Sequence, residues 1–153
     1  MSGLSVAKSG MREDSAVDLE TILLVEDEPA VRGLFAQALR HAGYTIIEAR
    51  NGAEALEVFD RIDGKIDLLL TDVRMPFLGG SELAGKLLAR RPDLRLLYIS
   101  GYAAKVELGP NAALLQKPFV RADLLRAVRS VLDRPLTVVQ EMSSQEQNGG
   151  DRP

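Results

Sequence analysis

Residues 67–76 read DLLLTDVRMP, and this stretch decides the fold. Its apolar run at 68–70 has no polar interruption, which is typical of a short strand buried on both faces of a parallel sheet. We expect that strand to span 67–71. The run ends at Asp72, and Gly79-Gly80 opens a helical pattern of apolar residues. A strand, a polar end, a turn and a helix in this order predict one unit of an α/β fold.

The same alternation extends in both directions from this stretch. Further strands are expected at 22–25, 44–48 and 94–99, with a fifth centred on 114–115. Helical spacing predicts helices over 29–42, 51–62, 79–92 and 120–133. Gly43 fits the position after the first helix, and Asn51 fits the cap of the second, with Glu54 as its capping-box partner. The pattern therefore predicts a doubly wound five-stranded parallel sheet with helices on both faces.

The composition excludes several function classes. The chain has 153 residues, which suits one domain, and its 46% hydrophobic residues are enough for a core. It has no cysteine, so disulfides, thiolate catalysis and Cys-ligated zinc are excluded. Its single histidine, His41, excludes sites built from several histidines, and we interpret it as a solvated residue on the first helix. The net charge of -3 argues against a broad surface for nucleic acid or anionic lipid.

The two ends of the chain differ from its centre. Residues 20–135 are expected to form the domain, after a flexible leader over 1–19 and before a polar, disordered tail over 136–153. No apolar run approaches the roughly 18 residues that indicate a membrane span. The start of the chain lacks the apolar stretch of a signal peptide. We therefore expect a cytoplasmic protein without a membrane or nucleic-acid partner, and a monomer or weak dimer.

Polar side chains follow four of the five expected strands. These strand ends are Glu26-Asp27-Glu28, Thr71-Asp72, Ser100-Gly101 and Gln116-Lys117. Ligands of such folds bind at the carboxyl ends of the strands, so we expect these groups to meet at one edge of the sheet. Clustered carboxylates favour a hard divalent cation with oxygen ligands, such as Mg²⁺, Mn²⁺ or Ca²⁺. A carboxylate can also act as a nucleophile and form an acyl phosphate, whose oxygens a lysine and a serine would bind.

Four motifs in order carry a resemblance to a known family. They are ILLVEDEP at 22–29, DLLLTDVRMP at 67–76, LYISGY at 97–102 and LQKPF at 115–119. Together they resemble the successive signatures of response-regulator receiver domains, the CheY-like superfamily of two-component signalling. The similarity runs from about residue 21 to residue 133 and is closest in style to the receivers of hybrid histidine kinases. It implies the flavodoxin-like strand order 2-1-3-4-5.

The resemblance implies a role for each residue at the strand ends. Asp72 would accept the phosphoryl group, and Ser100 and Lys117 would contact its oxygens. The implied cofactor is Mg²⁺, with Mn²⁺ as a substitute. Its ligands would be Asp72, Asp27, Glu26 (directly or through water) and the backbone carbonyl of Arg74. The implied partner is a sensor histidine kinase or a histidine phosphotransfer protein. Such a domain catalyses only its own phosphorylation and dephosphorylation.

Other positions concern the lifetime and the readout of the phosphorylated state. By the same resemblance, Arg74 and Tyr102 would tune how fast water reaches the acyl phosphate. Receivers usually carry Tyr or Phe at a switch position three residues before the lysine, and this chain has Leu114 there. The stretch from Ser100 to Lys117 is also short and contains Gly109-Pro110, which predicts a shortened fourth helix. The Lys117–Pro118 bond is often cis in the family.

Three alternative functions compete with this interpretation, and the residues at the strand ends argue against each of them. A flavodoxin-like redox protein needs a Ser/Thr/Gly phosphate loop after the first strand, where this chain has Glu26-Asp27-Glu28. A phosphatase of the haloacid-dehalogenase type needs a second aspartate two residues after its nucleophile, where this chain has Arg74. A receiver fold that serves as a phosphate-independent interaction module is the third. A DNA-binding output is disfavoured because no helix-turn-helix pattern follows Asp133.

Overall fold

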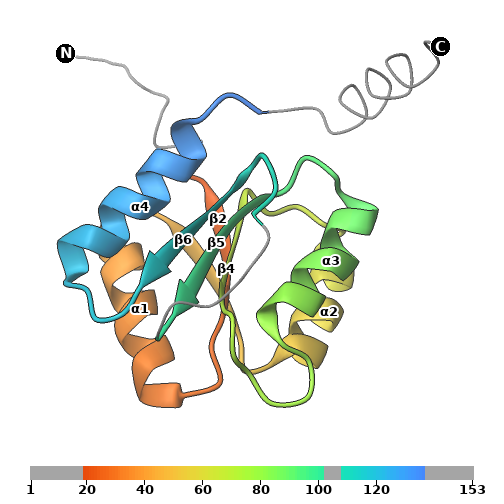
Figure 1. The fold of residues 1–153 in the computed structure, drawn as a ribbon, viewed down its shortest axis with the longest axis horizontal. Helices are drawn as coiled ribbons and strands as arrows, with labels where there is room; N and C mark the ends of the chain where they lie inside the picture. Colours follow the sequence, from red (N-terminus) through yellow and green to blue (C-terminus); the bar gives the residue numbers. More distant parts are fainter. Residues whose placement is uncertain (1–18, 102–107, 137–153) are drawn as a thin grey trace, which may run out of the picture.

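The computed structural model describes residues 19–101 and 108–136 (Figure 1). The expected leader and tail therefore lie almost entirely outside the described residues. Tyr102 and most of the predicted short fourth helix also lie outside them.

Five strands and four helices alternate along the described chain, with the labels of Figure 1. The strands are β2 (Thr21–Val25), β3 (Thr45–Ala49), β4 (Leu68–Asp72), β5 (Arg95–Ser100) and β6 (Ala112–Gln116). The helices are α1 (Pro29–His41), α2 (Gly52–Arg61), α3 (Gly80–Arg90) and α4 (Arg121–Asp133). Each lies within about one or two residues of the range expected from the sequence, which is the ordinary uncertainty of element ends.

The strands form one parallel sheet in the order β3-β2-β4-β5-β6. Counted along the chain, this is the predicted order 2-1-3-4-5. β4 lies in the centre, where Leu69 pairs with Leu23 of β2 on one side and with Leu96 of β5 on the other. The chain adds β3 on one side of β2 and the later strands on the other side, so the strand order reverses at β2. Ligands of such folds bind at the carboxyl ends of the strands beside this point.

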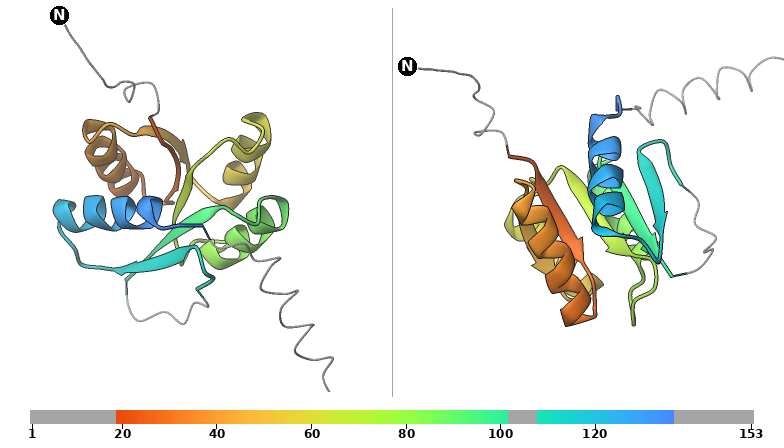
Figure 2. Two further views of the ribbon diagram at one scale, coloured as in Figure 1. Left: turned by 90° about the horizontal axis from the view of Figure 1, so that it is seen from above. Right: turned by 90° about the vertical axis from the view of Figure 1, so that its left-hand side faces the viewer.

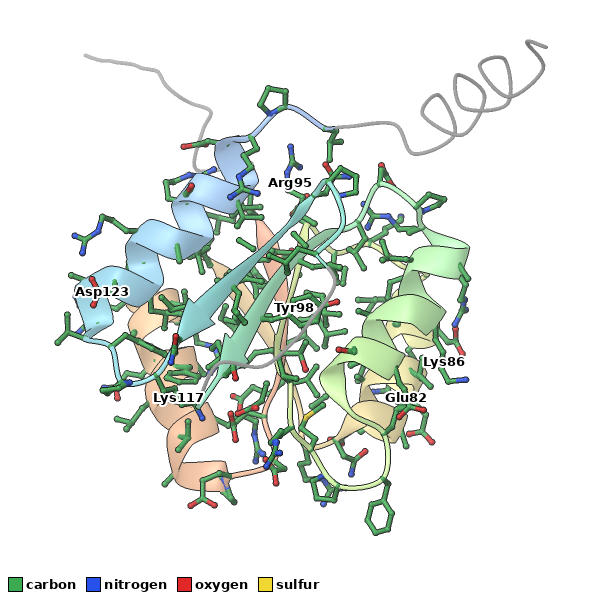
Figure 3. All side chains as sticks on the ribbon, in the orientation of Figure 1. Glu82, Lys86, Arg95, Tyr98, Lys117 and Asp123 are labelled. Atoms are coloured by element: carbon green, nitrogen blue, oxygen red, sulfur yellow. The ribbon has the colours of Figure 1, made fainter. Side chains whose placement is uncertain are left out.

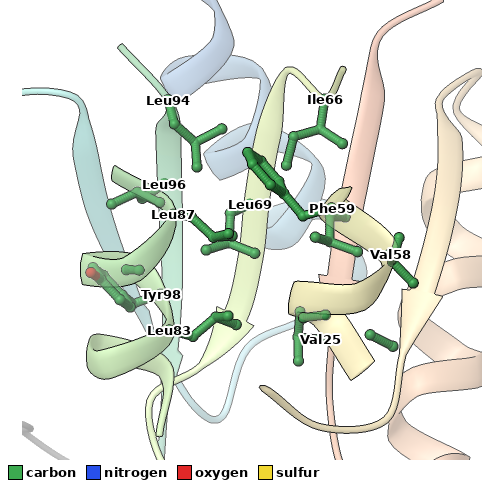
Figure 4. Packing of buried hydrophobic residues seen from close by; sticks show 14 of the residues in the cluster. Val25, Val58, Phe59, Ile66, Leu69, Leu83, Leu87, Leu94, Leu96 and Tyr98 are labelled. Atoms are coloured by element: carbon green, nitrogen blue, oxygen red, sulfur yellow. The ribbon is translucent and has the colours of Figure 1, made fainter. Parts of the chain in front are cut away.

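Two helices cover each face of the sheet. α1 and α4 lie on one face, and α2 and α3 lie on the other, as the views in Figures 1 and 2 agree. Alternate residues of β4 point to opposite faces, so Leu69 joins the cluster under α2 and α3, and Leu68 and Leu70 join the cluster under α1 and α4. Figure 4 shows the first cluster, in which Phe59, Leu83 and Leu87 pack on the sheet.

Local sequence fixes where the helices begin and end. Asn51 caps α2, because its Oδ1 accepts the N–H of Glu54 at 2.8 Å. In a capping box, the side chain of Glu54 would accept the N–H of Asn51. Here Glu54 Oε1 instead accepts the N–H of the preceding residue, Arg50, at 2.6 Å. After α1, Gly43 has φ 107°, a left-handed conformation that favours glycine.

Candidate functional site

The carboxyl ends of four strands meet at one edge of the sheet. Glu26 directly follows β2, Asp72 ends β4, Ser100 ends β5, and Lys117 follows β6. Figure 3 shows Lys117 at the arrow ends of β5 and β6, at the opposite end of the sheet from Arg95. The parallel topology thus collects polar residues that are far apart in the sequence.

Asp72 and Lys117 are in direct contact at this edge. Lys117 Nζ lies 3.0 Å from Asp72 Oδ2, and the backbone N–H of Arg74 donates to Asp72 Oδ1 at 2.9 Å. Asp72 is only 8% exposed. Each carboxylate oxygen therefore accepts one of these hydrogen bonds, and hydrogen bonds to an ionised group are stronger than those between neutral groups.

Backbone contacts position both members of this ion pair. The N–H of Lys117 donates to the carbonyl of Ser100 at 2.7 Å, and the N–H of Val73 donates to the carbonyl of Ile99 at 2.9 Å. The Lys117–Pro118 peptide is cis. The hydrogen bond to Ser100 holds the backbone of Lys117 against the end of β5, and the side chain extends from there to Asp72.

Glu26 is the buried acid of the site, with 3% of its surface exposed. Its Oε2 accepts the N–H of Glu28 at 3.1 Å, whereas its Oε1 is buried and has no hydrogen-bond partner among the described residues. Burial raises the pKa of Glu26 to about 7, opposed by the hydrogen bond from Glu28 and reinforced by the charge of Asp72. A buried carboxylate oxygen without a partner is costly, and a cation beside it would remove that cost.

The donor set fits a cation that keeps part of its water shell. Asp27 is exposed beside Glu26, and Arg74 is exposed two residues after Asp72. No three side chains of His, Asp or Glu in the ranges 19–101 and 108–136 are grouped to enclose a metal ion. Mg²⁺ usually takes one or two carboxylates plus carbonyl and water oxygens, so the unpaired oxygen of Glu26 and the neighbouring acids suit it better than a closed cage would.

Ser100 and Leu114 lie where the strand pattern expected them. Ser100 is 3% exposed at the end of β5, two residues from Tyr98 on the same face of the sheet. Leu114 of β6 is half-buried against the cluster under α2 and α3, and its register partner on β5 is Tyr98. The sequence interpretation missed Tyr98, which is buried, with its pKa raised by that burial. The sequence could have indicated it, because Tyr98 lies two residues before Ser100 in the same strand and therefore points to the same face of the sheet.

Two further residues that position the site were not anticipated. A side-chain Cβ at Gly80 would lie 2.3 Å from the carbonyl oxygen of Asp72, so only glycine allows the start of α3 to approach β4 this closely. Arg32 of α1 donates to the carbonyl of Glu26 at 2.8 Å and to Glu48 Oε1 at 3.2 Å. His41, in contrast, is exposed at the last residue of α1, as expected.

No helix in the described residues is both long and apolar enough to cross a membrane.

Comparison with known proteins agrees with this arrangement. Residues 22–129 match the response regulator receiver domain. The chain is 38% identical over 120 residues to the response regulator receiver protein CpdR of Brucella abortus, covering 74% of this chain and 98% of CpdR. It is 36% identical over 137 residues to the sensor kinase CckA of the same organism, covering 84% of this chain but only 14% of that kinase.

Solved structures give the same result. The receiver domain from the hybrid histidine kinase CckA has 37% identity and a TM-score of 0.66, covering 74% of this chain and 99% of that domain. The response regulator protein TrrA from Thermotoga maritima, solved with Mg²⁺ and beryllofluoride, has 29% identity and a TM-score of 0.62, covering 74% of this chain and 99% of TrrA. Receiver domains are signalling domains that work with sensor histidine kinases. The chain belongs to the family of response regulator receiver domains.

Proposed function

We propose that this receiver accepts a phosphoryl group on Asp72 from a phosphohistidine partner, in a reaction that depends on Mg²⁺. The observation that carries the proposal is the contact of 3.0 Å between Asp72 Oδ2 and Lys117 Nζ at the open edge of the sheet. A nearly buried carboxylate beside an ammonium group is suited to take up a phosphoryl group, whose oxygens the ammonium then binds.

In the proposed transfer, a carboxylate oxygen of Asp72 forms a bond to phosphorus while the bond from phosphorus to the imidazole nitrogen breaks. The imidazole keeps the electron pair of that bond and takes up a proton. Lys117 stays beside the phosphoryl oxygens, and the hydroxyl of Ser100 donates to one of them. A bound Mg²⁺ supplies charge neutralisation. Asp27, Asp72 and the carbonyl of Arg74 would hold it, with Glu26 bound directly or through water.

We propose α1 as part of the docking surface for the phosphohistidine partner. A groove of about 270 Å³ between α1 and α4 is lined mainly by apolar side chains. Phe35 and Phe119 stack there with ring centroids 5.7 Å apart, and Leu34 beside them is 66% exposed. An exposed apolar surface rimmed by polar residues supports protein binding.

The phosphorylated state would then either shift the balance between two conformations or pass the phosphoryl group onward. In the first case the new oxygens draw Ser100 inward, and contacts made in only one state bias the equilibrium. The absence of an aromatic ring at Leu114 favours the relay or sink with little change of shape. A phosphate-independent interaction module is the alternative that the experiment below separates from both.

The test is labelling with acetyl phosphate and Mg²⁺, followed by intact mass. We expect a gain of about 80 Da, one phosphoryl group, that disappears with EDTA and in Asp72→Asn. Lys117→Ala should label at least about a hundredfold more slowly, as expected when one stabilising donor is removed. Asp67→Asn is the matched control, because Asp67 is exposed near the opposite end of the same strand.

Absence of labelling would be followed by titration with beryllofluoride, which imitates the phosphoryl group. If this also gave no Mg²⁺-dependent response, the phosphate-independent module would replace the proposal.

A further inference from the structure

The loop between β4 and α3 carries an aromatic side chain that the fold leaves in solvent. Phe77 is 103% exposed, the highest value among the large hydrophobic residues described. Its φ is 69°, a left-handed conformation that bulky residues rarely adopt. The N–H of Leu78 donates to the carbonyl of Pro76 at 2.8 Å, so Phe77 lies at the centre of a tight three-residue turn. Glycine would suit this position better on backbone grounds alone.

The two ends of the loop are fixed, so the ring is held outward. Leu78 packs where Gly52 has no side chain, since a Cβ there would lie 2.6 Å from Leu78 Cδ2. Gly80 approaches the carbonyl of Asp72, and its N–H donates to the carbonyl of Val73 at 3.0 Å. Phe77 directly precedes Leu78 and lies between Val73 and Gly80, whose backbones this hydrogen bond joins, so its exposure follows from the packing of its neighbours.

Phe77 lies at the same edge of the sheet as the acceptor. Its loop begins directly after Asp72, at the carboxyl end of β4. Val120, which is 64% exposed, also lies at this edge, between the end of β6 and the start of α4, and Leu34 in α1 is 66% exposed. Exposed apolar residues on one side of a protein indicate a binding surface, whereas single ones scattered over it do not.

We propose that Phe77 is an anchor that inserts into an apolar recess of the phosphohistidine-bearing partner, close to its histidine. This inference rests on the proposed function. A donor must bring its phosphorus within bonding distance of Asp72, so its surface around the histidine covers the loop that begins at the next residue. Buried aromatic anchors dominate the energetics of such interfaces, and an anchor held in place before binding loses little conformational freedom.

A single tryptophan tests the burial of this position directly. The chain contains no tryptophan, so Phe77→Trp introduces the only one. Leu19→Trp is the matched control, because Leu19 is exposed before β2, at the opposite end of the sheet. The probe is the purified kinase portion of the Brucella abortus sensor kinase CckA. We expect emission from Phe77→Trp to shift to shorter wavelength as the kinase is added, and emission from Leu19→Trp to stay unchanged. A shift caused by raising the concentration of the receiver alone would assign the anchor to a second copy and overturn the proposal.

Phosphotransfer supplies the second readout. The phosphorylated kinase portion of CckA is mixed with the unaltered receiver, Phe77→Ala and Leu19→Ala, and each rate is divided by that variant's rate with acetyl phosphate. We expect the ratio to fall at least about tenfold for Phe77→Ala, as for loss of a binding hot spot, and to stay unchanged for Leu19→Ala. Phe77→Tyr should restore most of the ratio.

The outcomes separate the anchor from the proposed function. Labelling by acetyl phosphate with an unchanged ratio for Phe77→Ala would overturn the anchor alone. Transfer from the kinase to the unaltered receiver without a shift in the emission of Phe77→Trp would also overturn it. No labelling of the unaltered receiver by acetyl phosphate or by the kinase, together with no Mg²⁺-dependent response to beryllofluoride, would instead refute the proposed function.

Discussion

At the scale of single residues, Glu26 makes the stability of the protein depend on pH. Burial raises its pKa from 4.5 to about 7, and the charge of Asp72 contributes in the same direction. Between these two pH values the folded protein holds a proton that the unfolded chain has released. The free energy of unfolding contributed by Glu26 therefore falls as the pH rises through this window, and the loss is complete above it.

We expect Glu26→Gln to remove this loss. Without divalent cations, the free energy of unfolding at about pH 8 should rise by about 1–3 kcal/mol relative to the unaltered protein, and it should change little at about pH 4. Urea unfolding at the two pH values measures the difference. Glu57→Gln, at an exposed position of α2, is the control.

Mg²⁺ gives the same experiment a second arm. Added at about pH 8, it should stabilise the unaltered protein more than Glu26→Gln, because ligands that bind only the folded state add to its stability. An equal pH dependence in both proteins would contradict the interpretation of Glu26 as the buried, partly protonated acid.

The sequence predicted that Asp72 and Lys117 meet at one edge of the sheet, but it did not predict which hydrogen-bond partners the polar groups there would have. Asp72 and Lys117 could be placed together because strand ends in a parallel sheet share one edge, whatever the packing. The buried, unpartnered oxygen of Glu26 depends on tertiary packing around the first loop, which no local pattern reports. Tyr98 was missed for a related reason, since its relation to Leu114 is set by strand register.

At the scale of elements, the start of α3 packs closely against the end of β4 because residue 80 is a glycine. We expect Gly80→Ala to destabilise the protein by about 1–3 kcal/mol, the usual cost of forcing an extra group into a packed site. It should also slow acetyl phosphate labelling, because its Cβ would meet the backbone oxygen of Asp72 at 2.3 Å. Urea unfolding and the labelling rate are the two measurements.

Gly85 of the same helix is the matched control. A Cβ there would meet nothing within 4 Å, so Gly85→Ala should stabilise the protein by about 0.5–1 kcal/mol through helix propensity. Equal effects of the two substitutions would show that the close approach of α3 to Asp72 has no influence on the site.

Element types and order followed from the sequence because periodicity is a local property. The apolar run at 68–70 and the helical spacing after Asn51 each predicted one element, and both are present. The close approach of Gly80 could not be read in the same way. The pair Gly79-Gly80 indicated a turn, but which glycine faces another segment depends on the angle at which α3 packs on the sheet.

At the scale of the whole molecule, Arg129 joins elements from both ends of the described chain. Its guanidinium donates to Glu20 Oε1 at 2.8 Å and to Glu20 Oε2 at 3.0 Å, just before β2. It also donates to the hydroxyl of Tyr44 at 3.2 Å and to Asp133 Oδ1 at 3.1 Å. These bonds raise the pKa of Arg129 further, chiefly through Glu20. This network lies at the amino end of the sheet, away from the proposed site.

We expect Arg129→Ala to lower the free energy of unfolding by about 1 kcal/mol. This is the upper end of values for exposed ion pairs, because the ion pairs with both Glu20 and Asp133 are lost. The loss should shrink in about 1 M salt, which screens exposed charges. Arg126→Ala, whose partner Asp123 lies in the same helix, should cost less. Urea unfolding at low and high salt measures both variants. Acetyl phosphate labelling should be unchanged in Arg129→Ala at a temperature where this variant is fully folded. Slower labelling there would contradict the separation of this network from the site.

The central position of β4 has a consequence for the lifetime of a phosphorylated state. Asp72, the proposed acceptor, ends a strand that is paired on both sides and buried on both faces, so the amide hydrogens of this strand should exchange with solvent only when the whole domain unfolds. Local unfolding of an outer strand, β3 or β6, leaves β4 folded. Hydrolysis of an acyl phosphate on Asp72 would therefore proceed from the native conformation, through water that reaches it between the loops, and a partner or a side chain in those loops would set its rate.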